Sequence, residues 1–147
     1  MGERCKEDLV PIECPTKVML VDIKGKGRGV VATQLIKKGE VIEICPTIVL
    51  SNLESEFIRT RSNKLKFYAL ELLKENVHVL HLGYGMLYNH SPEPNAEIEY
   101  DGSDFVVFRS LKDVNPGEEV VYDYGFDEQE EFLQLESEKL GFIKGRQ

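Results

Sequence analysis

The sequence predicts a single, mostly β domain with a helical insertion and a C-terminal helix. Three observations support this class: short apolar runs end at glycine or proline turns, the apolar period becomes helical in one stretch, and strands and helices do not alternate along the chain. A chain of 147 residues with 41% hydrophobic residues can bury one core without help from metals or disulfides. We therefore expect one domain over residues 1–147, with its core over about 17–125.

The amino-terminal part is predicted to contain an extended lead-in and three strands. Residues 1–16 are polar and include two prolines. Apolar residues then recur over Lys17–Ile23, as expected for a strand that ends at a glycine-rich turn. Val30–Ala32 predicts a second strand. A third apolar run extends over Val41–Leu50, with an expected interruption at Pro46.

Between Leu53 and Asn76 the apolar residues recur at helical spacing, with lysines between them. One face of the expected helix would carry four residues: Leu65, Tyr68, Ala69 and Leu72. We expect this helix to break near Ser62-Asn63, where two poor helix formers meet.

Strands are again predicted in the second half of the chain. The first is short and covers Val77–Leu82. Ala96–Tyr100 and Phe105–Leu111 flank an Asp-Gly turn, which is typical of a hairpin. A last strand is expected over Glu118–Tyr124, after an Asn-Pro-Gly turn, and Asp127–Leu140 is predicted to be a helix.

Composition excludes several classes of protein. With 18 basic and 26 acidic residues, the net charge of −8 argues against nucleic-acid binding; it serves solubility or attracts a basic partner. No apolar run approaches the roughly 18 residues of a membrane span, and the polar start is no signal peptide. The chain has three cysteines, Cys5, Cys14 and Cys45, an odd number, and no two of them form a CxxC motif. We therefore expect a reduced intracellular protein without a cysteine zinc site, and no basic run marks it as nuclear.

Gly25-Lys26-Gly27-Arg28-Gly29 is the first segment that could carry chemistry. Glycines let a ligand approach the backbone, and the amides of such a turn can hold a carboxylate or a phosphate. The segment is no Walker A motif, because no Gly-Lys-Ser/Thr follows it. Taken alone, the segment is better explained as a tight hairpin turn with solvated cations.

The loop Asn89–Asn95, with the sequence Asn-His-Ser-Pro-Glu-Pro-Asn, is the second such segment. Its polar side chains on a backbone restricted by prolines could bind a polar ligand, or form an ordinary surface turn. His78 and His81 do not predict a metal site, because residues i and i+3 of a strand point to opposite faces.

The third segment, Gly117–Gly125, contains Tyr122 and Tyr124. Residues two apart on a strand face the same side. Two phenols on one side could line a narrow channel that offers a π face to a cation and hydroxyls to an amine. The alternative is that both rings pack at the edge of the core.

In this order, Gly-Lys-Gly-Arg-Gly, Asn-His-Ser-x-x-Pro-Asn and Gly-Glu-Glu-x-x-x-Asp-Tyr-Gly resemble the motifs of the SET-domain protein lysine methyltransferases. The run Ser110–Glu119 into the last motif is also similar, and the motifs extend from Lys24 to Gly125. The resemblance implies a β-clip-like SET fold of short sheets with a C-terminal pseudoknot. It also places a variable insert at 51–78 and a C-terminal helical segment at 126–147.

The resemblance implies S-adenosylmethionine as methyl donor, with no metal, and a lysine in a histone or another basic protein as acceptor. Lys26, Gly27 and Arg28 would contact the cofactor largely through their backbone. Asn89 and His90 would hold its amino-acid and adenine portions. Direct contact with nucleic acid or a membrane is not expected.

Two tyrosines would carry the chemistry implied by the resemblance. Tyr124 matches the catalytic tyrosine of the family, and Tyr122 matches a position where tyrosine or phenylalanine influences how many methyl groups are added. Here tyrosine favours low methylation states. The nucleophile is a neutral lysine amine, and a desolvated channel beside a sulfonium would lower the lysine pKa from about 10.4. Orientation is then the main requirement, and no acid–base pair is needed.

The chain departs from the family in two respects. It has no cysteine-rich segment after the last motif, where many members bind zinc and close the site. Phe126, Phe132 or Phe142 could cover the adenine instead, or a second subunit of a homodimer could do so. The family also often has Arg-Phe-Ile before Asn-His-Ser, where this chain has Met86-Leu87-Tyr88.

Two alternatives to a methyltransferase stay open from the sequence. One is a catalytically inactive SET-fold module that binds a peptide or a partner; the presence of Asn89, His90 and Tyr124 together argues against it. The other ignores the resemblance and treats Lys24–Gly29 as the site of a phosphate-containing ligand. Binding of S-adenosylmethionine, followed by methyl transfer, separates all three.

Overall fold

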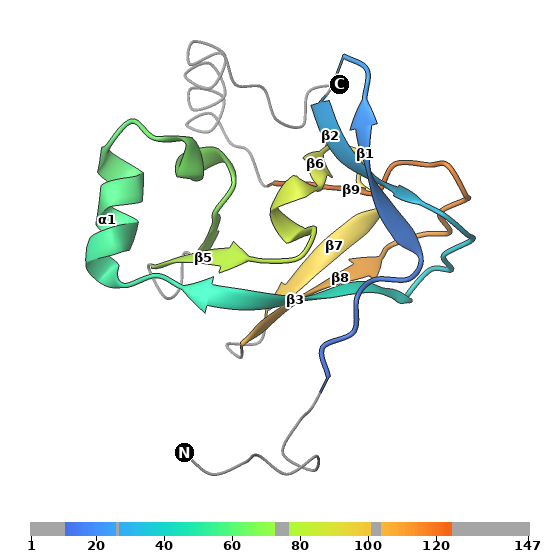
Figure 1. The fold of residues 1–147 in the computed structure, drawn as a ribbon, viewed down its shortest axis with the longest axis horizontal. Helices are drawn as coiled ribbons and strands as arrows, with labels where there is room; N and C mark the ends of the chain where they lie inside the picture. Colours follow the sequence, from blue (N-terminus) through green and yellow to red (C-terminus); the bar gives the residue numbers. More distant parts are fainter. Residues whose placement is uncertain (1–10, 26, 73–76, 101–103, 125–147) are drawn as a thin grey trace.

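The computed structural model describes residues 11–25, 27–72, 77–100 and 104–124. The strands in this part of the chain form a two-stranded and a seven-stranded sheet (Figure 1). The strands are β1 (Val18–Ile23), β2 (Gly27–Ala32), β3 (Val41–Val49), β4 (Leu70–Leu72), β5 (Val77–His81), β6 (Asn89–His90), β7 (Ala96–Tyr100), β8 (Phe105–Ser110) and β9 (Val121–Tyr122). The helices are α1 (Asn52–Thr60) and the short 3₁₀ helices η2 (Lys64–Phe67) and η3 (Gly85–Leu87). A mostly β fold is thus confirmed.

The larger sheet has the strand order β4-β5-β3-β8-β7-β9-β6. Its long members pair antiparallel, as expected for neighbouring hairpin strands. The pairs β6–β9 and β7–β9 are parallel. Parallel pairing needs a long connection, so it brings together segments that are distant in the sequence.

The small sheet is a hairpin in which Ile23 pairs with Gly27 and Val18 with Ala32. It contacts the carboxyl-terminal motif through backbone hydrogen bonds: Val120 N–H donates to the Val30 carbonyl at 2.8 Å, and Ala32 N–H donates to the Glu118 carbonyl at 2.9 Å. Val30 and Val120 are both fully buried. Strand β2, which follows the glycine-rich turn, is therefore held against the last motif by buried backbone hydrogen bonds.

Strand β3 does not break at Pro46, contrary to the expectation from the sequence. Pro46 lacks an N–H, but it stays in register with Phe105, and its carbonyl accepts a hydrogen bond from Leu82 N–H at 2.8 Å. The irregularity lies earlier, as a bulge between Val41 and Glu43. A bulge adds one residue and changes which side chains point inward.

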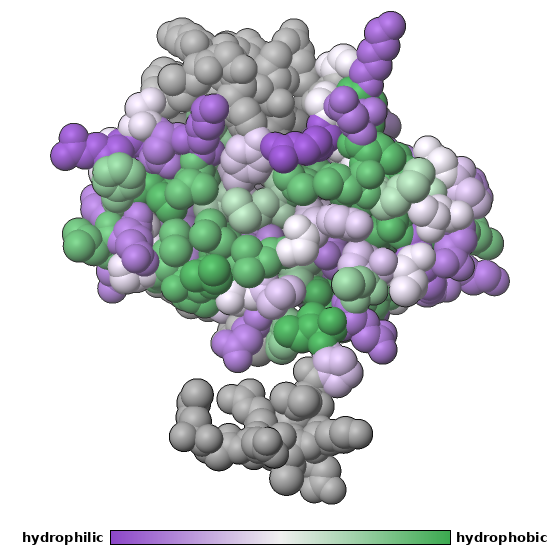
Figure 2. Space-filling view, viewed as in Figure 1, coloured by the Kyte–Doolittle hydropathy of each residue, from purple (hydrophilic) through white to green (hydrophobic). Residues whose placement is uncertain are grey.

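After the bulge, β3 alternates between core and solvent as far as Cys45, whereas its last two residues, Ile48 and Val49, are both exposed. Cys45 is fully buried, whereas Ile44 and Ile48 are exposed. Figure 2 shows apolar residues gathered over the middle of the face seen in Figure 1, with hydrophilic residues at its rim. This face is partly apolar, because a sheet with one solvent-facing side keeps part of its apolar surface in water.

The insert is only partly helical. Helix α1 begins with a capping box between Ser51 and Glu54. The chain then leaves the helix, as the expected break near Ser62-Asn63 predicts, but it does not return to an α-helix. It forms η2 and then β4, whose backbone pairs with β5. The predicted single face of Leu65 to Leu72 is therefore wrong, because a tertiary strand partner replaces local helical hydrogen bonds.

The last strand is shorter than predicted. Instead of Glu118–Tyr124, only Val121 and Tyr122 form β9. The expected C-terminal helix over 126–147, with Phe126, Phe132 and Phe142, lies outside the described residues. Within the described part of the chain, no helix is long and apolar enough to cross a membrane.

Candidate active site

The Asn-His-Ser segment and the tyrosine-containing last motif meet where β6 pairs with β9. Asn89 lies opposite Val121, and His90 lies opposite Tyr122. Ser91 N–H extends the pairing by donating to the Tyr122 carbonyl at 3.1 Å. This arrangement places the Asn-His-Ser segment directly beside strand β9 of the last motif (Figure 1).

Asn95 holds the two segments in place. Its backbone N–H donates to the Val121 carbonyl at 3.2 Å, and its side-chain carbonyl accepts from Val121 N–H at 2.9 Å. Its amide nitrogen donates to the Glu119 carbonyl at 2.8 Å. Because Asn95 is only 6% exposed, these bonds are shielded from water and fix the register of the short strand β9.

Tyr122 and Tyr124 lie on the same side, as their spacing predicts. Their ring centroids are 4.6 Å apart, and the His90 ring lies 5.1 Å from that of Tyr124. The Tyr124 hydroxyl donates to the Tyr88 carbonyl. Burial raises the pKa of both Tyr122 and Tyr124, so both phenols are neutral and available as hydrogen-bonding groups at physiological pH.

His90 is held in its neutral form. Its Nδ1 accepts a hydrogen bond from Tyr124 N–H at 2.9 Å, which requires an unprotonated nitrogen. Burial lowers the His90 pKa, and the nearby Asp123 carboxylate and a hydrogen bond with the Tyr122 backbone only partly oppose this effect. The imidazole therefore fixes the backbone of Tyr124 and is not a cation beside it.

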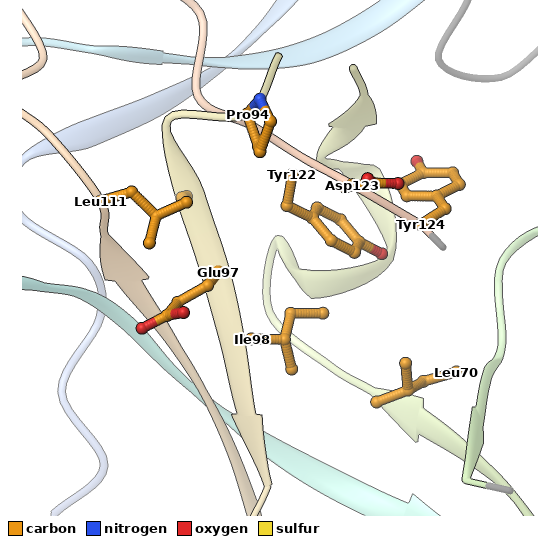
Figure 3. A pocket seen from close by; sticks show the side chains of 9 residues that line it. Leu70, Pro94, Glu97, Ile98, Leu111, Tyr122, Asp123 and Tyr124 are labelled. Atoms are coloured by element: carbon orange, nitrogen blue, oxygen red, sulfur yellow. The ribbon is translucent and has the colours of Figure 1, made fainter. Parts of the chain in front are cut away.

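A cavity of about 360 Å³ opens beside the tyrosines (Figure 3). Its lining is mainly apolar, with two carboxylates among the nine residues: Leu70, Pro94, Ala96, Glu97, Ile98, Leu111, Tyr122, Asp123 and Tyr124. In Figure 3 the Tyr122 ring projects between strand β7 and Tyr124. An apolar cavity that ends at two neutral phenols can take an aliphatic chain with an amine at its end.

Asn89 connects the site to the glycine-rich turn. Its amide nitrogen donates to the Arg28 carbonyl at 2.9 Å and to Glu119 Oε2 at 2.7 Å. Successive side chains of a strand point to opposite faces. Strand β6 therefore presents Asn89 to the glycine-rich strand β2, and His90 to the tyrosines.

The glycines of this turn have different roles. Gly25 and Gly27 have φ angles of 85° and 83°, and among the described residues a Cβ on either would meet nothing within 4 Å. Their backbone is thus open to an approaching molecule. Lys26 lies outside the described residues, whereas Gly27 and Arg28 begin β2 and are exposed.

Three residues near the site were not predicted as part of it. Tyr68 shares a hydrogen bond with the Arg28 side chain, and burial raises the Tyr68 pKa while Arg28 opposes this. Glu119 accepts from Asn89, and Tyr88 accepts from Tyr124. No local signal identifies Tyr68, because it reaches the site only when the insert folds back.

The two histidines of β5 are core residues in the structure. His78 is 4% exposed and His81 is fully buried. His78 Nε2 lies 3.9 Å from Glu71, and the His81 ring is stacked with Phe108 at 6.1 Å. Among the described residues, no group of three or more potential metal ligands is found.

Gly29→Ala is expected to destabilise the protein through the Asn89–Glu119 hydrogen bond. An added Cβ would lie 2.5 Å from Ile23 Cδ1, 2.8 Å from Glu119 Oε2 and 3.1 Å from Asn89 Nδ2. Because the two polar atoms bind each other, they cannot both retreat without weakening their bond. We expect the free energy of unfolding to fall by about 1–3 kcal/mol, as for other overpacked sites, measured by urea denaturation.

Gly25→Ala is the matched control for this substitution. It introduces an alanine at a positive φ without a steric clash, so it measures backbone strain alone. A Gly29→Ala protein with the wild-type free energy of unfolding would contradict the close packing of Gly29 against Asn89 and Glu119.

Comparison with known proteins gives consistent matches. The family model described as SET domain matches residues 27–125. The histone-lysine N-methyltransferase, H3 lysine-37 specific, of Schizosaccharomyces pombe is 30% identical over 105 residues, which cover 71% of this chain and 70% of that protein. A crystal structure of a candidate histone methyltransferase of Plasmodium falciparum has a TM-score of 0.60 and 31% identity, covering 80% of this chain and 99% of that one.

Proposed function

The chain belongs to the SET-domain family of protein lysine methyltransferases, and from this premise we propose that it methylates a lysine of a histone or a similar basic protein at the site where β6 meets β9. The family uses S-adenosylmethionine as methyl donor. The observation that carries the proposal is the pair of neutral phenols, Tyr122 and Tyr124, at an apolar cavity beside the Asn89 segment.

The cavity is proposed to receive the target lysine. Leu70 and Ile98 offer apolar walls for the four methylenes, and the phenols lie where the amine would end. Glu97 and Asp123 also line the cavity, and a lysine approaches carboxylates favourably. A desolvated amine loses its proton more readily, which supplies the neutral nucleophile that the reaction requires.

The cofactor is proposed to bind on the other side of β6, along the glycine-rich turn. The open backbone at Gly25 and Gly27 fits a ligand that makes close main-chain contacts. The Arg28 guanidinium provides a cation for a carboxylate. Asn89 and Lys26 complete this assignment on the glycine-rich side, and His90 is proposed to contact the cofactor from the tyrosine side of β6. Because side chains alternate along β6, the cofactor and the lysine can lie on opposite sides of this strand. In-line methyl transfer requires that the two reactants approach from opposite sides.

When bound, S-adenosylmethionine supplies a methyl group on a positively charged sulfur. The site residues would align the lysine amine with that methyl group, so that an N–C bond could form as the C–S bond breaks, and the amine would then lose its extra proton to solvent. Tyr124 donates its hydroxyl hydrogen to the Tyr88 carbonyl, so its oxygen lone pairs are directed elsewhere and can accept from the amine. Tyr124 is therefore assigned the catalytic, orienting role.

Several broader features belong to the same proposal. The pseudoknot of the SET fold would form at the β6–β9 pairing, which the parallel register supports. One domain over 1–147 would carry the activity, alone or as a homodimer whose partner closes the site. The histone-directed relative supports a nuclear or other intracellular location.

The first experiment is titration calorimetry with S-adenosylmethionine, followed by transfer of radiolabelled methyl groups to mixed histones. Binding and label on a histone are expected. If the protein binds S-adenosylmethionine but transfers no label to histones or to any protein of a whole-cell lysate, it is instead the inactive binding module. A folded protein that binds no S-adenosylmethionine would refute the cofactor assignment.

Tyr122→Phe is expected to shift the products toward higher methylation states. Tyr122 lines the cavity next to Tyr124, so loss of its hydroxyl removes one acceptor for the amine and makes room around it. The ring itself stays packed edge-on against Phe108, with a centroid distance of 5.3 Å. Mass spectrometry of a methylated peptide should show mainly monomethyl-lysine with the wild type and more di- and trimethyl-lysine with the variant. Mainly trimethyl-lysine from the wild type would contradict this role.

A further inference from the structure

A buried carboxylate lies beneath the loop that precedes the Asn89 segment. Glu43 is only 3% exposed, although glutamate is among the residue types least often buried. It follows directly on the bulge in β3, which lets both Ile42 and Glu43 point inward. Cys45, two residues later, faces the same side and is fully buried.

Three donors converge on the Glu43 carboxylate. The Tyr88 hydroxyl donates to Oε1 at 2.7 Å, and Tyr84 N–H donates to Oε2 at 3.0 Å. The Cys45 thiol also contributes a hydrogen bond. Burial raises the Glu43 pKa, and these donors partly offset that effect by favouring the ionised form. A carboxylate that only accepts is the form that satisfies all three groups.

The segment Gly83–Leu87 packs closely against β3 and β5. A Cβ on Gly83 would lie 2.3 Å from Glu43 Oε2, and Gly83 has a φ of 68°. A Cβ on Gly85 would lie 2.8 Å from the His81 ring and 3.1 Å from Cys45 Sγ. Only glycines allow this approach, so η3 is held in one position against the buried carboxylate.

Tyr88 connects this buried group to the site. Its side chain ends at Glu43, and its ring is stacked on Phe108 with centroids 4.0 Å apart. Its backbone carbonyl accepts the hydrogen bond of the Tyr124 hydroxyl. Phe108 in turn packs against Tyr122. Tyr88 therefore contacts Tyr124 directly, through a hydrogen bond, and is connected to Tyr122 only indirectly, through the Phe108 ring.

We propose that Glu43 is a positioning residue for methyl transfer: by fixing the Tyr88 side chain it fixes the Tyr88 carbonyl, and this carbonyl sets the direction of the Tyr124 hydroxyl. The proposal rests on the proposed function, since it assigns the orienting role to Tyr124. Glu43 touches neither substrate nor cofactor. Its effect is on alignment, and small misalignments slow methyl transfer strongly because the reacting atoms must lie in line.

The test compares Tyr88→Phe and Glu43→Gln with the control Ser55→Ala. Tyr88→Phe removes only the hydroxyl at Glu43 and keeps the ring and the carbonyl. Glu43→Gln replaces an acceptor oxygen by an NH₂ that would face a donor. Ser55→Ala removes a similar buried hydrogen bond, from His78 N–H at 2.8 Å, but in the contact between α1 and β5.

Tyr88→Phe is expected to lower kcat about tenfold and to alter the ratio of methylation states, with the S-adenosylmethionine Kd within about twofold of wild type. Glu43→Gln should act in the same direction and more strongly. Ser55→Ala should change the melting temperature but neither kcat nor the product ratio. If Tyr88→Phe matches Ser55→Ala in kcat and product ratio, the positioning role is wrong.

A second readout does not depend on activity. The ring signals of Tyr124 in the NMR spectrum can be assigned because they disappear in Tyr124→Phe. We expect the chemical shifts of these signals to change in Tyr88→Phe and to stay the same in Ser55→Ala. An unmoved Tyr124 signal would overturn the inference even if Glu43→Gln failed to fold. Conversely, a moved signal in a protein without any methyl transfer would contradict the proposed function and retain the structural link.

Discussion

Tyr124→Phe is expected to lower kcat by roughly 10²–10³-fold, the usual effect of removing one preorganised hydrogen-bonding group from a transition state. The variant keeps the ring, and with it the packing against Tyr122 and His90. Its backbone N–H still donates to His90 Nδ1. The S-adenosylmethionine Kd should therefore stay within about twofold of wild type, since only the hydroxyl is lost.

The two quantities are measured separately, by radiolabelled methyl transfer and by titration calorimetry. The Tyr88 carbonyl also loses its donor, so the free energy of unfolding should fall by about 1 kcal/mol. Tyr100→Phe, at the far end of β7, is a matched control that removes a hydroxyl without an assigned role. Wild-type kcat in Tyr124→Phe would refute the catalytic role of this residue.

Asn89→Ala is the second substitution with a large expected effect, and it should act on cofactor binding. It removes the hydrogen bonds to the Arg28 carbonyl and to Glu119, of which the second involves a carboxylate. Bonds to charged groups contribute about 1.5–3 kcal/mol. We expect the S-adenosylmethionine Kd to rise about 10- to 100-fold, with a smaller change in kcat at saturating cofactor.

Asn115→Ala is the matched control for Asn89→Ala. Asn115 also donates its side-chain amide to a glutamate, Glu118, at 2.8 Å, but in an exposed turn. It should leave the S-adenosylmethionine Kd unchanged. A Kd for Asn89→Ala equal to that of Asn115→Ala would contradict the assignment of the Asn89 segment to the cofactor.

The parts of the fold that depend on neighbouring residues were predictable. The β1–β2 hairpin and the β7–β8 hairpin lie where turn residues separate apolar runs, because such a turn brings adjacent strands into register. The break after α1 is also a local property, since Ser62 and Asn63 favour leaving the helix. The roles of Asn89 and Tyr124 came from the resemblance of three motifs and stay predictions.

The secondary-structure predictions are wrong where a backbone partner that is distant in the sequence determines the structure. Leu70–Leu72 has helical spacing with Leu65, yet it forms β4 because β5 offers its backbone hydrogen bonds. Pro46 stays within β3 because its carbonyl still finds Leu82 N–H. Propensity is a weak signal that tertiary pairing can override.

The sequence by itself determined which residues carry the motifs, that Tyr122 and Tyr124 share one side, and that the chain is mostly β. These properties follow from residue type, spacing and strand period, all of which are local. Only the tertiary structure decided that Asn89 binds Glu119, that Tyr68 reaches Arg28, and that Glu43 lies beneath Tyr88. Each of these contacts joins residues many positions apart, and its geometry depends on a bulge, a parallel bridge or a folded insert that no local pattern encodes.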